Sequence, residues 1–325
     1  SFFYGTIFTP LNLGGPTHTC QHCGARFWYE ERVRGCGRTA LQIYNKCCRG
    51  GSIYLPPYRP PPEPLLSRLT GRDRVLSNHF FENIRRYNSM FAMTSMGVNI
   101  INSINDGHGP YIFKISGQLC HRIGSLIPKH GARPEYCQLY IFDTENEIRN
   151  RVAVASHREM SFEPNEDIVA SLMTMLNAHN PVVQLFRTAR DRLHDQLEDH
   201  YSVKLFATPN EHGNIYSAPV ASEVVGLMVN DIGTTEKGRD LIVEDHSLQL
   251  QRVNETHCKF MAMQYPLLFP YGEDGFHENL KYRQCHRSGM IKRKKVSLVE
   301  YFAYRLHDRD DDFNTPLRAR AHTVI

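Results

Sequence analysis

The sequence lacks the marks of several large classes of protein. No run of about 18 apolar residues occurs, so no transmembrane helix is expected. A basic start, an apolar stretch and a small-residue cleavage site do not follow one another near the N-terminus, and we expect no signal peptide. A G-x-x-x-x-G-K-[ST] loop and a His-x-His pair within an apolar strand are also missing, which excludes these two nucleotide- and metal-binding motifs from the chain.

The net charge is small, and the chain has a single tryptophan. The 38 basic and 34 acidic residues leave a net charge of +4, which does not by itself indicate a nucleic-acid-binding protein. The nine cysteines are an odd number in a chain longer than most disulfide frameworks, so we expect reduced thiols and an intracellular protein. Because the first residue is serine, we also expect the chain to be a piece of a longer protein.

Cysteine and proline divide the chain into parts. Five of the nine cysteines lie between residues 16 and 55, and PPYRPPPEP at 56–64 predicts a stiff, extended connector. We expect a cysteine-rich zinc-knuckle module at residues 1–57, a linker at 58–64, a larger domain at 65–305 and a divergent tail at 306–325.

The larger domain is predicted to be α+β. Residues 164–198 indicate two helices, with acids in the first turn, Asn180 at the end of the first helix and Pro181 at the start of the second. A hairpin is expected around DIGTTEKGRD at 231–240. The fold predicted for the chain is a small zinc-knuckle module followed by a mixed, mainly antiparallel sheet domain with helices. Strand patterns occur at 91–100, 109–117, 135–143, 204–208, 222–230, 239–246 and 248–253.

The main candidate site is made of Cys20-x-x-Cys23 and the adjacent pair Cys47-Cys48. Zinc prefers four tetrahedral ligands, and two-residue spacing lets two thiolates converge through a tight turn. Neighbouring residues of a strand point in opposite directions, so the second pair can bind one ion only where the backbone bends. The glycines at 50 and 51 favour such a bend.

Other interpretations of these cysteines stay open. His18 is the main substitute for one ligand of the second pair, and His22 and Cys36 are further candidates for the fourth position. Unrelated thiols are an alternative, and a redox pair is a weaker one because no βαβ pattern surrounds the motif. In the zinc interpretation the aromatic residues 27–29 cover one side of the knuckle, and the metal supplies folding free energy that about 40 residues cannot obtain from a core.

Basic residues gather at two places where phosphate contacts are conceivable. One set flanks the cysteines, and the other is the run IKRKK at 291–295, which is also typical of nuclear import signals or of a solvated loop. The candidate nucleic-acid-binding residues are Arg26, Arg32, Arg34, Arg49, Lys292, Arg293, Lys294 and Lys295.

Acidic residues suggest a weaker hypothesis. Asp143 and Glu145, with Glu147, could bind a cation in a nuclease, but capping or surface roles are expected for these three. Arg187 and Arg190 could belong to a basic helical face, which nearby acids largely neutralise.

Six phrases of the sequence resemble the N-terminal, pre-catalytic region of plant Helitron-type transposases, which are helicase-like proteins. They follow the order of the family and are spread over roughly residues 15–305. The phrases are CQHCGARFWYEER, CCRGG-x-IYLPP, YNSMFAMTSMG, GPYIFKISGQLCHRIGSLIP, QLYIFDTENEIRNR and VNETHCKFMAMQYPLLFPYGEDGFH.

The resemblance implies an enzyme only in the complete family members. Those carry an endonuclease with a His-hydrophobic-His metal pair and nucleophilic tyrosines, then a helicase, and they use a divalent cation and ATP. Since the motifs of both activities are missing here, no catalytic residue is carried over. We expect a non-catalytic DNA-binding fragment with a structural zinc ion, single-stranded DNA as partner, no membrane contact and a nuclear location. The alternative is a scaffold domain that positions the missing endonuclease and helicase without touching DNA.

Overall fold

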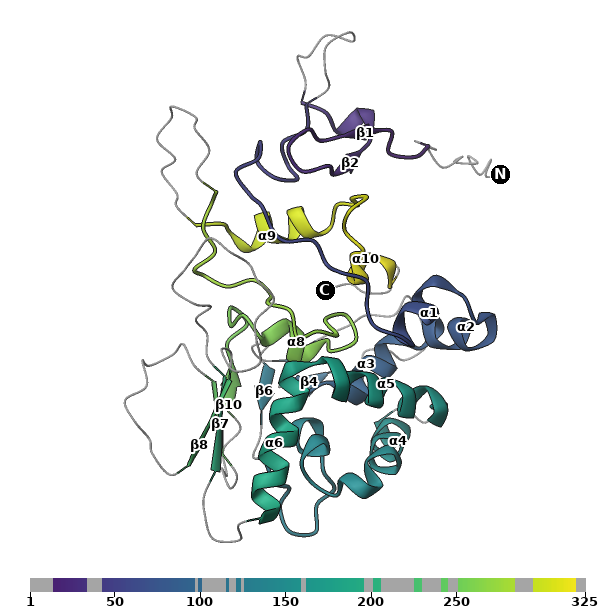
Figure 1. Ribbon diagram of the computed structural model, residues 1–325, viewed down its shortest axis with the longest axis vertical. Helices are drawn as coiled ribbons and strands as arrows, with labels where there is room; N and C mark the ends of the chain where they lie inside the picture. Colours follow the sequence, from purple (N-terminus) through teal and green to yellow (C-terminus); the bar gives the residue numbers. More distant parts are fainter. Residues whose placement is uncertain are drawn as a thin grey trace, which may run out of the picture. The chain divides into compact units, whose positions relative to one another are not determined.

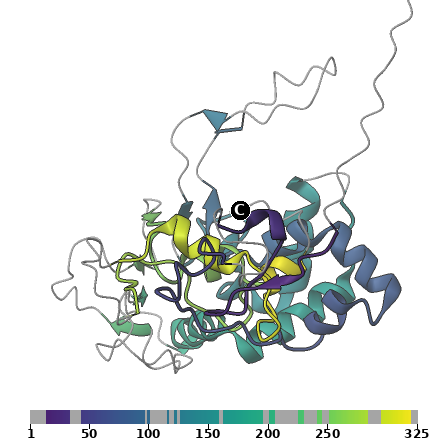
Figure 2. The same ribbon diagram turned by 90° about the horizontal axis from the view of Figure 1, so that it is seen from above.

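The computed structural model of the chain combines helices with small antiparallel sheets (Figure 1 and Figure 2). It divides into two compact units: the first comprises residues 1–59 and 278–314, and the second comprises residues 60–277 and 315–325. The structure describes residues 14–33, 43–96, 99–100, 115–116, 121–123, 126–158, 162–195, 201–205, 225–229, 241–244, 251–283 and 295–319.

This division differs from the domains expected from the sequence. The boundary between Arg59 and Pro60 falls inside the predicted linker, but residues 278–305 join the N-terminal unit instead of the larger domain. The expected tail is itself divided, because residues 306–314 belong to the first unit and the rest to the second. Local composition could not reveal this grouping, since it depends on contacts between residues more than 200 positions apart.

The first unit brings the two ends of the described chain together. Strands β1 (His18–Thr19) and β2 (Arg26–Phe27) form an antiparallel hairpin that leads into the 3-10 helix η1 (Tyr29–Glu31). Helix α9 (Leu298–Arg305) begins with a capping box, in which Ser297 and Glu300 satisfy each other's backbone amides. In both views α9, in yellow, lies beside the dark N-terminal residues of this unit.

Backbone hydrogen bonds join these distant segments. The amide of Arg283 donates to the carbonyl of Ser52 at 2.8 Å, and the amide of Phe313 donates to that of Tyr58 at 3.1 Å. The core is small and aromatic: the rings of Phe27 and Tyr44 stack with their centroids 5.0 Å apart. Other buried side chains of this core are Ile53, Leu55, Tyr58, Tyr301 and Tyr304.

Helices dominate the second unit. The two helices expected at 164–198 are confirmed as α5 (Glu166–His179) and α6 (Pro181–Asp195), with Asn180 as the C-cap residue between them. No helix in the described part of the chain has both the length and the apolar character needed to cross a bilayer. The remaining helices are α1 (Leu65–Thr70), α2 (Arg74–Glu82), α3 (Ile84–Phe91), α4 (Glu147–Arg158), α8 (Phe260–Gln264), α10 (Thr315–Arg318), η2 (Tyr136–Tyr140) and η3 (Thr144–Asn146).

All strand pairs between the named strands of this unit are antiparallel. The strand orders are β10-β6-β3, β4-β5 and β8-β7-β9. The strands are β3 (Ser95–Met96), β4 (Asn99–Ile100), β5 (Ile115–Ser116), β6 (His121–Ile123), β7 (Tyr201–Leu205), β8 (Val225–Val229), β9 (Leu241–Glu244) and β10 (Gln251–Val253).

Two local predictions for this unit are wrong. The segment 135–143 is not a strand but contains η2, because a short apolar run that is buried does not reveal its period. Strands β8 and β9 do not pair with each other as a hairpin; both pair with β7, which lies between them. The short sequence separation of β8 and β9 favoured a hairpin. With β7 between them instead, β7 forms backbone hydrogen bonds along both of its edges.

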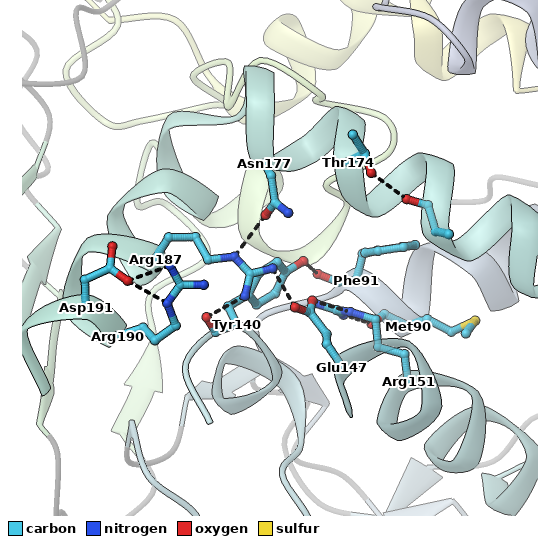
Figure 3. A network of polar contacts seen from close by, with 11 residues as sticks. Met90, Phe91, Tyr140, Glu147, Arg151, Thr174, Asn177, Arg187, Arg190 and Asp191 are labelled. Carbon is cyan, nitrogen blue, oxygen red and sulfur yellow. Dashed lines mark hydrogen bonds and ion pairs between the residues drawn. The ribbon is translucent and has the colours of Figure 1, made fainter. Parts of the chain in front are cut away.

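A buried ion network joins the helices of the second unit (Figure 3). Glu147 accepts hydrogen bonds from Arg151 at 2.8 Å and from Arg187 at 2.6 Å. Arg187 also donates to the carbonyl of Tyr140 and to Asn177, and thus ties α6 to η2 and α5. Glu147, expected at the surface, is 3% exposed and Arg151 is 0% exposed, so the network belongs to the core.

Candidate metal centre

The four cysteines of the predicted site lie together in the first unit. Their sulfur atoms are all within 4.8 Å of one another and could hold a metal ion. The sulfurs of Cys20 and Cys48 are 3.7 Å apart, and those of Cys23 and Cys47 are 3.5 Å apart. A disulfide would need about 2.05 Å, whereas ligands about 2.3 Å from a tetrahedral zinc ion are about 3.8 Å from one another. The measured distances therefore fit shared coordination of one ion.

The first pair of ligands lies in the loop of the β1–β2 hairpin. The amide of Cys20 donates to the carbonyl of Ala25, and the amide of Gly24 donates back to the carbonyl of Cys20, both at 2.8 Å. Gly24 has a φ of 68°, a backbone conformation that glycine adopts without strain. The amides of His22 and Ala25 hydrogen-bond the sulfurs of Cys20 and Cys23, so the turn aims both thiols to one side.

The second pair lies in a turn and not in a strand, which removes the difficulty of adjacent ligands. The amide of Arg49 donates to the carbonyl of Asn45 at 2.9 Å, as in one turn of helix, where neighbouring side chains are about 100° apart. The three residues that follow the pair have φ values of 51°, 64° and 85° and reverse the chain. The amide of the last of them, Gly51, donates to the sulfur of Cys48 at 3.2 Å.

The alternative ligands take other positions. The ring of His18 packs against the rings of Phe27 and Tyr29, each with a centroid distance of 5.6 Å, and the clustered ligand atoms include no histidine. The ring of His22 lies so close to Gly51 that a β-carbon there would be 3.1 Å from its Nδ1 atom. Cys36 lies outside the described residues.

Arg309 is a component of the site that sequence reasoning missed. Its Nε atom donates to the carbonyl oxygen of Cys23 at 3.0 Å, and its Nη2 atom lies 3.6 Å from the sulfur of the same residue. The side chain is 4% exposed, and its guanidinium group covers the ring of Tyr304 at 3.8 Å. Arg309 lies in the stretch HDRDDD, in which charge alone indicates a surface loop, so no local signal pointed to this position.

Contacts among the thiols shift their pKa values in opposite directions. Hydrogen bonds from Cys23, Cys47 and Cys48 lower the pKa of Cys20. For Cys23, the hydrogen bond with Cys20 acts to raise the pKa, but the bonds with the other two thiols bring it down to about 6. The same contacts with the first pair raise the pKa of Cys47 and of Cys48. Without metal, the first pair therefore ionises before the second, and a bound metal would displace the remaining protons.

A cavity of about 450 Å³ adjoins the cluster. Its lining includes Cys20 and Cys23 together with Tyr304, Arg309 and Asp312. The first pair is thus the side of the cluster from which an ion or a reagent would approach, whereas Cys47 and Cys48 are fully buried.

The arginines expected to contact phosphate already have partners within the first unit. Arg26 forms ion pairs with Asp308 and Asp310, and Arg49 forms one with Glu300 at 2.9 Å. The guanidinium group of Arg32 lies 3.5 Å from the ring centroid of its neighbour Tyr29. These contacts engage the guanidinium charge of Arg26 and Arg49 and the flat face of the Arg32 guanidinium group, which binding to a nucleic acid would require.

The second basic set is described only in part. Lys295 is exposed and its backbone bridges to that of Lys281, while Arg34, Lys292, Arg293 and Lys294 lie outside the described residues. The acid expected to bind a cation in the nuclease hypothesis, Asp143, accepts hydrogen bonds from Asn146 at 2.9 Å and from Asn150 at 3.0 Å. Asp143 stands at the N-cap position of η3, and its carboxylate is held by these two asparagine side chains instead of by a backbone amide.

No protein-family model matches the chain, and no curated protein matches it at a significant level. A functional interpretation therefore rests on the arrangement of the residues.

Proposed function

We propose that the four-cysteine site holds a structural zinc ion. Four soft thiolate donors in a near-tetrahedral arrangement suit zinc. All four ligands come from the protein, which leaves no position for a reacting water molecule and favours a structural role over a catalytic one. The single observation that carries this proposal is the convergence of four sulfur atoms within 4.8 Å without disulfide spacing.

We further propose that the chain is a non-catalytic, DNA-binding part of a Helitron-type transposase that acts in the nucleus. The motifs from CQHC to the phrase ending at His277 support this proposal through their family resemblance, and the convergence of the cysteines agrees with a folded knuckle at its start. The exposed Lys295 and the basic run that it ends are the most direct candidates for contacts with single-stranded DNA. Endonuclease and helicase chemistry, with ATP and a divalent cation, would belong to other parts of a complete family member.

A specific observation favours the alternative, in which this region is a scaffold without direct DNA contact. The described arginines beside the knuckle are engaged by acidic or aromatic partners. Asp308, Asp310 and Asp311 are exposed next to the cluster, and a zinc ion with four thiolates would add a further net negative charge. This face would repel phosphate.

The test is to measure metal content and then the affinity of the same sample for single-stranded DNA across a salt series. We expect one zinc ion per chain and a binding constant that falls with salt, with a slope of about −0.7 for each phosphate contact. Replacing residues 292–295 by glutamine should flatten the slope, whereas Arg26→Gln, which removes a paired charge, should not. Zinc without salt-dependent DNA binding would support the scaffold, and absence of zinc would remove the metal proposal.

A further inference from the structure

Arg309 is a buried cation without a carboxylate partner. Among the described residues no carboxylate oxygen lies within the 4.0 Å ion-pair distance of its guanidinium group. The oxygen atoms that accept its hydrogen bonds are the backbone carbonyls of Cys23, Tyr304 and His307. Burying a charge costs several kcal/mol, and carbonyl acceptors offset only a part of that cost, so an anion close by would stabilise the guanidinium group further.

The cysteine cluster supplies that anion when it binds metal. Four thiolates around one divalent ion carry a net charge of minus two, and the sulfur of Cys23 is 3.6 Å from the Nη2 atom of Arg309. The geometry is that of an N–H···S hydrogen bond to a metal ligand, an interaction that orients ligands and tunes metal affinity.

We propose that Arg309 is the charge partner of the metal–thiolate cluster, and that it couples metal binding to the docking of residues 305–314 on the knuckle. This inference rests on the proposed zinc site. Arg309 is a positioning residue, since it contacts a ligand and not the ion.

The contacts of the docked segment explain how the coupling works. Asp312 accepts a hydrogen bond from the amide of Tyr58 at 2.9 Å, and Asn314 bonds the carbonyl of Arg305, so the segment is held at its far end without the metal. Arg26 joins the segment to strand β2 through Asp308 and Asp310, and Arg309 joins it to the ligand Cys23 itself. Because linkage is reciprocal, the factor by which docking of the segment strengthens zinc binding equals the factor by which zinc strengthens docking.

Arg305 is a matched control in the same segment. It is 8% exposed, donates to the carbonyl of Pro56 at 2.7 Å and stacks on the ring of Tyr58 at 4.0 Å. None of the described contacts of Arg305 reaches a sulfur atom. Arg305→Met therefore removes a buried arginine from the segment without removing a contact to the metal ligands.

The first experiment compares zinc affinity by chelator competition in the full chain and in the Arg309→Met, Arg309→Lys and Arg305→Met variants. We expect Arg309→Met to weaken zinc binding by about 10- to 100-fold, the usual effect of losing a partner of a metal ligand. Arg309→Lys should weaken it less because the charge remains, and Arg305→Met should have the smallest effect because it loosens the segment without removing a contact to a metal ligand. In the Co²⁺-loaded protein, the thiolate-to-metal charge-transfer band should shift in both Arg309 variants but not in Arg305→Met. A residue that only stabilised the fold would not change this band.

The second experiment keeps the proposal testable if Arg309→Met does not fold, because it uses the conservative variant Arg309→Lys. Hydrogen exchange of the zinc-loaded wild-type chain is compared with that of zinc-loaded Arg309→Lys. We expect the amides of residues 305–314 to exchange faster in the variant, while those of the cysteine turns and of α5 keep their rates.

The outcomes separate this inference from the zinc proposal. A wild-type chain that binds no zinc removes the proposed function and the inference with it. Zinc binding that is equally tight in wild type and Arg309→Met removes the inference alone, as does equal exchange of residues 305–314 in zinc-loaded wild type and zinc-loaded Arg309→Lys.

Discussion

The two units bury arginines in contrasting ways. In the second unit Arg151 is fully buried and Arg187 nearly so, and both reach the carboxylate of Glu147 at 2.6 to 2.7 Å. In the first unit Arg309 is also buried, but the negative group beside it is the sulfur of Cys23. A carboxylate is ionised at neutral pH, whereas four thiols become thiolates together only when a metal binds them.

This contrast indicates which unit can fold without a metal ion. The second unit has long helices, a network of hydrogen-bonded charges and an apolar core between α3, α4, α5 and α6. Within its described residues, the first unit has two-residue strands, the short 3-10 helix η1, the eight-residue helix α9 and a small aromatic core. We therefore expect the first unit to depend on metal and the second to be independent of it.

The largest expected effect comes from removing the metal ligands. The double variant Cys20→Ser, Cys23→Ser should lose zinc and unfold the first unit, since structural zinc contributes about 10–16 kcal/mol of apparent binding free energy. Trp28, the single tryptophan, lies in this unit and its Nε1 atom donates to the carbonyl of Gly14, so its fluorescence reports this unit alone. Circular dichroism at helix wavelengths should change little.

The control for this change is a cysteine of the second unit. Cys137 is buried in η2, and Cys137→Ala should retain full metal content and the native fluorescence of Trp28. Full metal content in the double serine variant would show that the ligand set is wrong.

A smaller effect is expected from the network of the second unit. Glu147→Gln leaves Arg151 and Arg187 buried without a counter-charge and should lower the free energy of unfolding of this unit by about 3–5 kcal/mol. Urea unfolding followed by circular dichroism measures this loss. Exposed Glu145→Gln is the control, and Trp28 fluorescence should stay native in both variants.

An equal loss of stability in Glu145→Gln would mean that the effect comes from net charge and not from the buried network. Loss of zinc in Glu147→Gln would contradict the independence of the two units.

The smallest effect concerns the order of thiol labelling in the metal-free protein. For as long as the first unit keeps its fold after chelation, an alkylating reagent at pH 7 should modify Cys20 and Cys23 before Cys47 and Cys48, because contacts with neighbouring thiols lower the pKa of both, that of Cys23 to about 6. Burial raises the pKa of Cys137 and of Cys258 to about 12, so these two should react last. Mass spectrometry of labelled peptides at successive times measures the order.

The pH dependence of the stability follows from the lowered pKa of Cys23. The folded-state pKa of Cys23, about 6, lies below the ordinary thiol value of 9.0, so its ionisation stabilises the metal-free fold at pH values above 9. This contribution is lost as the pH falls through 6, and labelling of Cys23 should slow over the same range. Labelling of Cys258 as fast as that of Cys23 at pH 7 would contradict the assigned shifts.

Much of the local structure could be predicted from the sequence. The helices α5 and α6 carry their own start and stop signals in Asn165, Asn180 and Pro181, and these signals act over a single turn. The clustering of the four cysteines was also predicted, because two short-range pairs with glycines beside them restrict where the sulfurs can point. The segment 135–143 was predicted wrongly, since its apolar residues fit a strand and a buried 3-10 helix equally well.

The sequence by itself thus determined the two pairs of clustered cysteines, the turns that hold them and the strongest helices, because each depends on neighbours within a few residues. Only the tertiary structure decided that Arg309 completes the surroundings of the cysteines, that Arg26 and Arg49 are held by Asp308 and Glu300, and that Glu147 is buried. In each of the first two cases the partners are more than 200 residues apart in the chain. A charged side chain becomes buried only where folding brings an opposite charge or several hydrogen-bond acceptors to it. The local sequence pattern around the side chain does not reveal such long-range contacts.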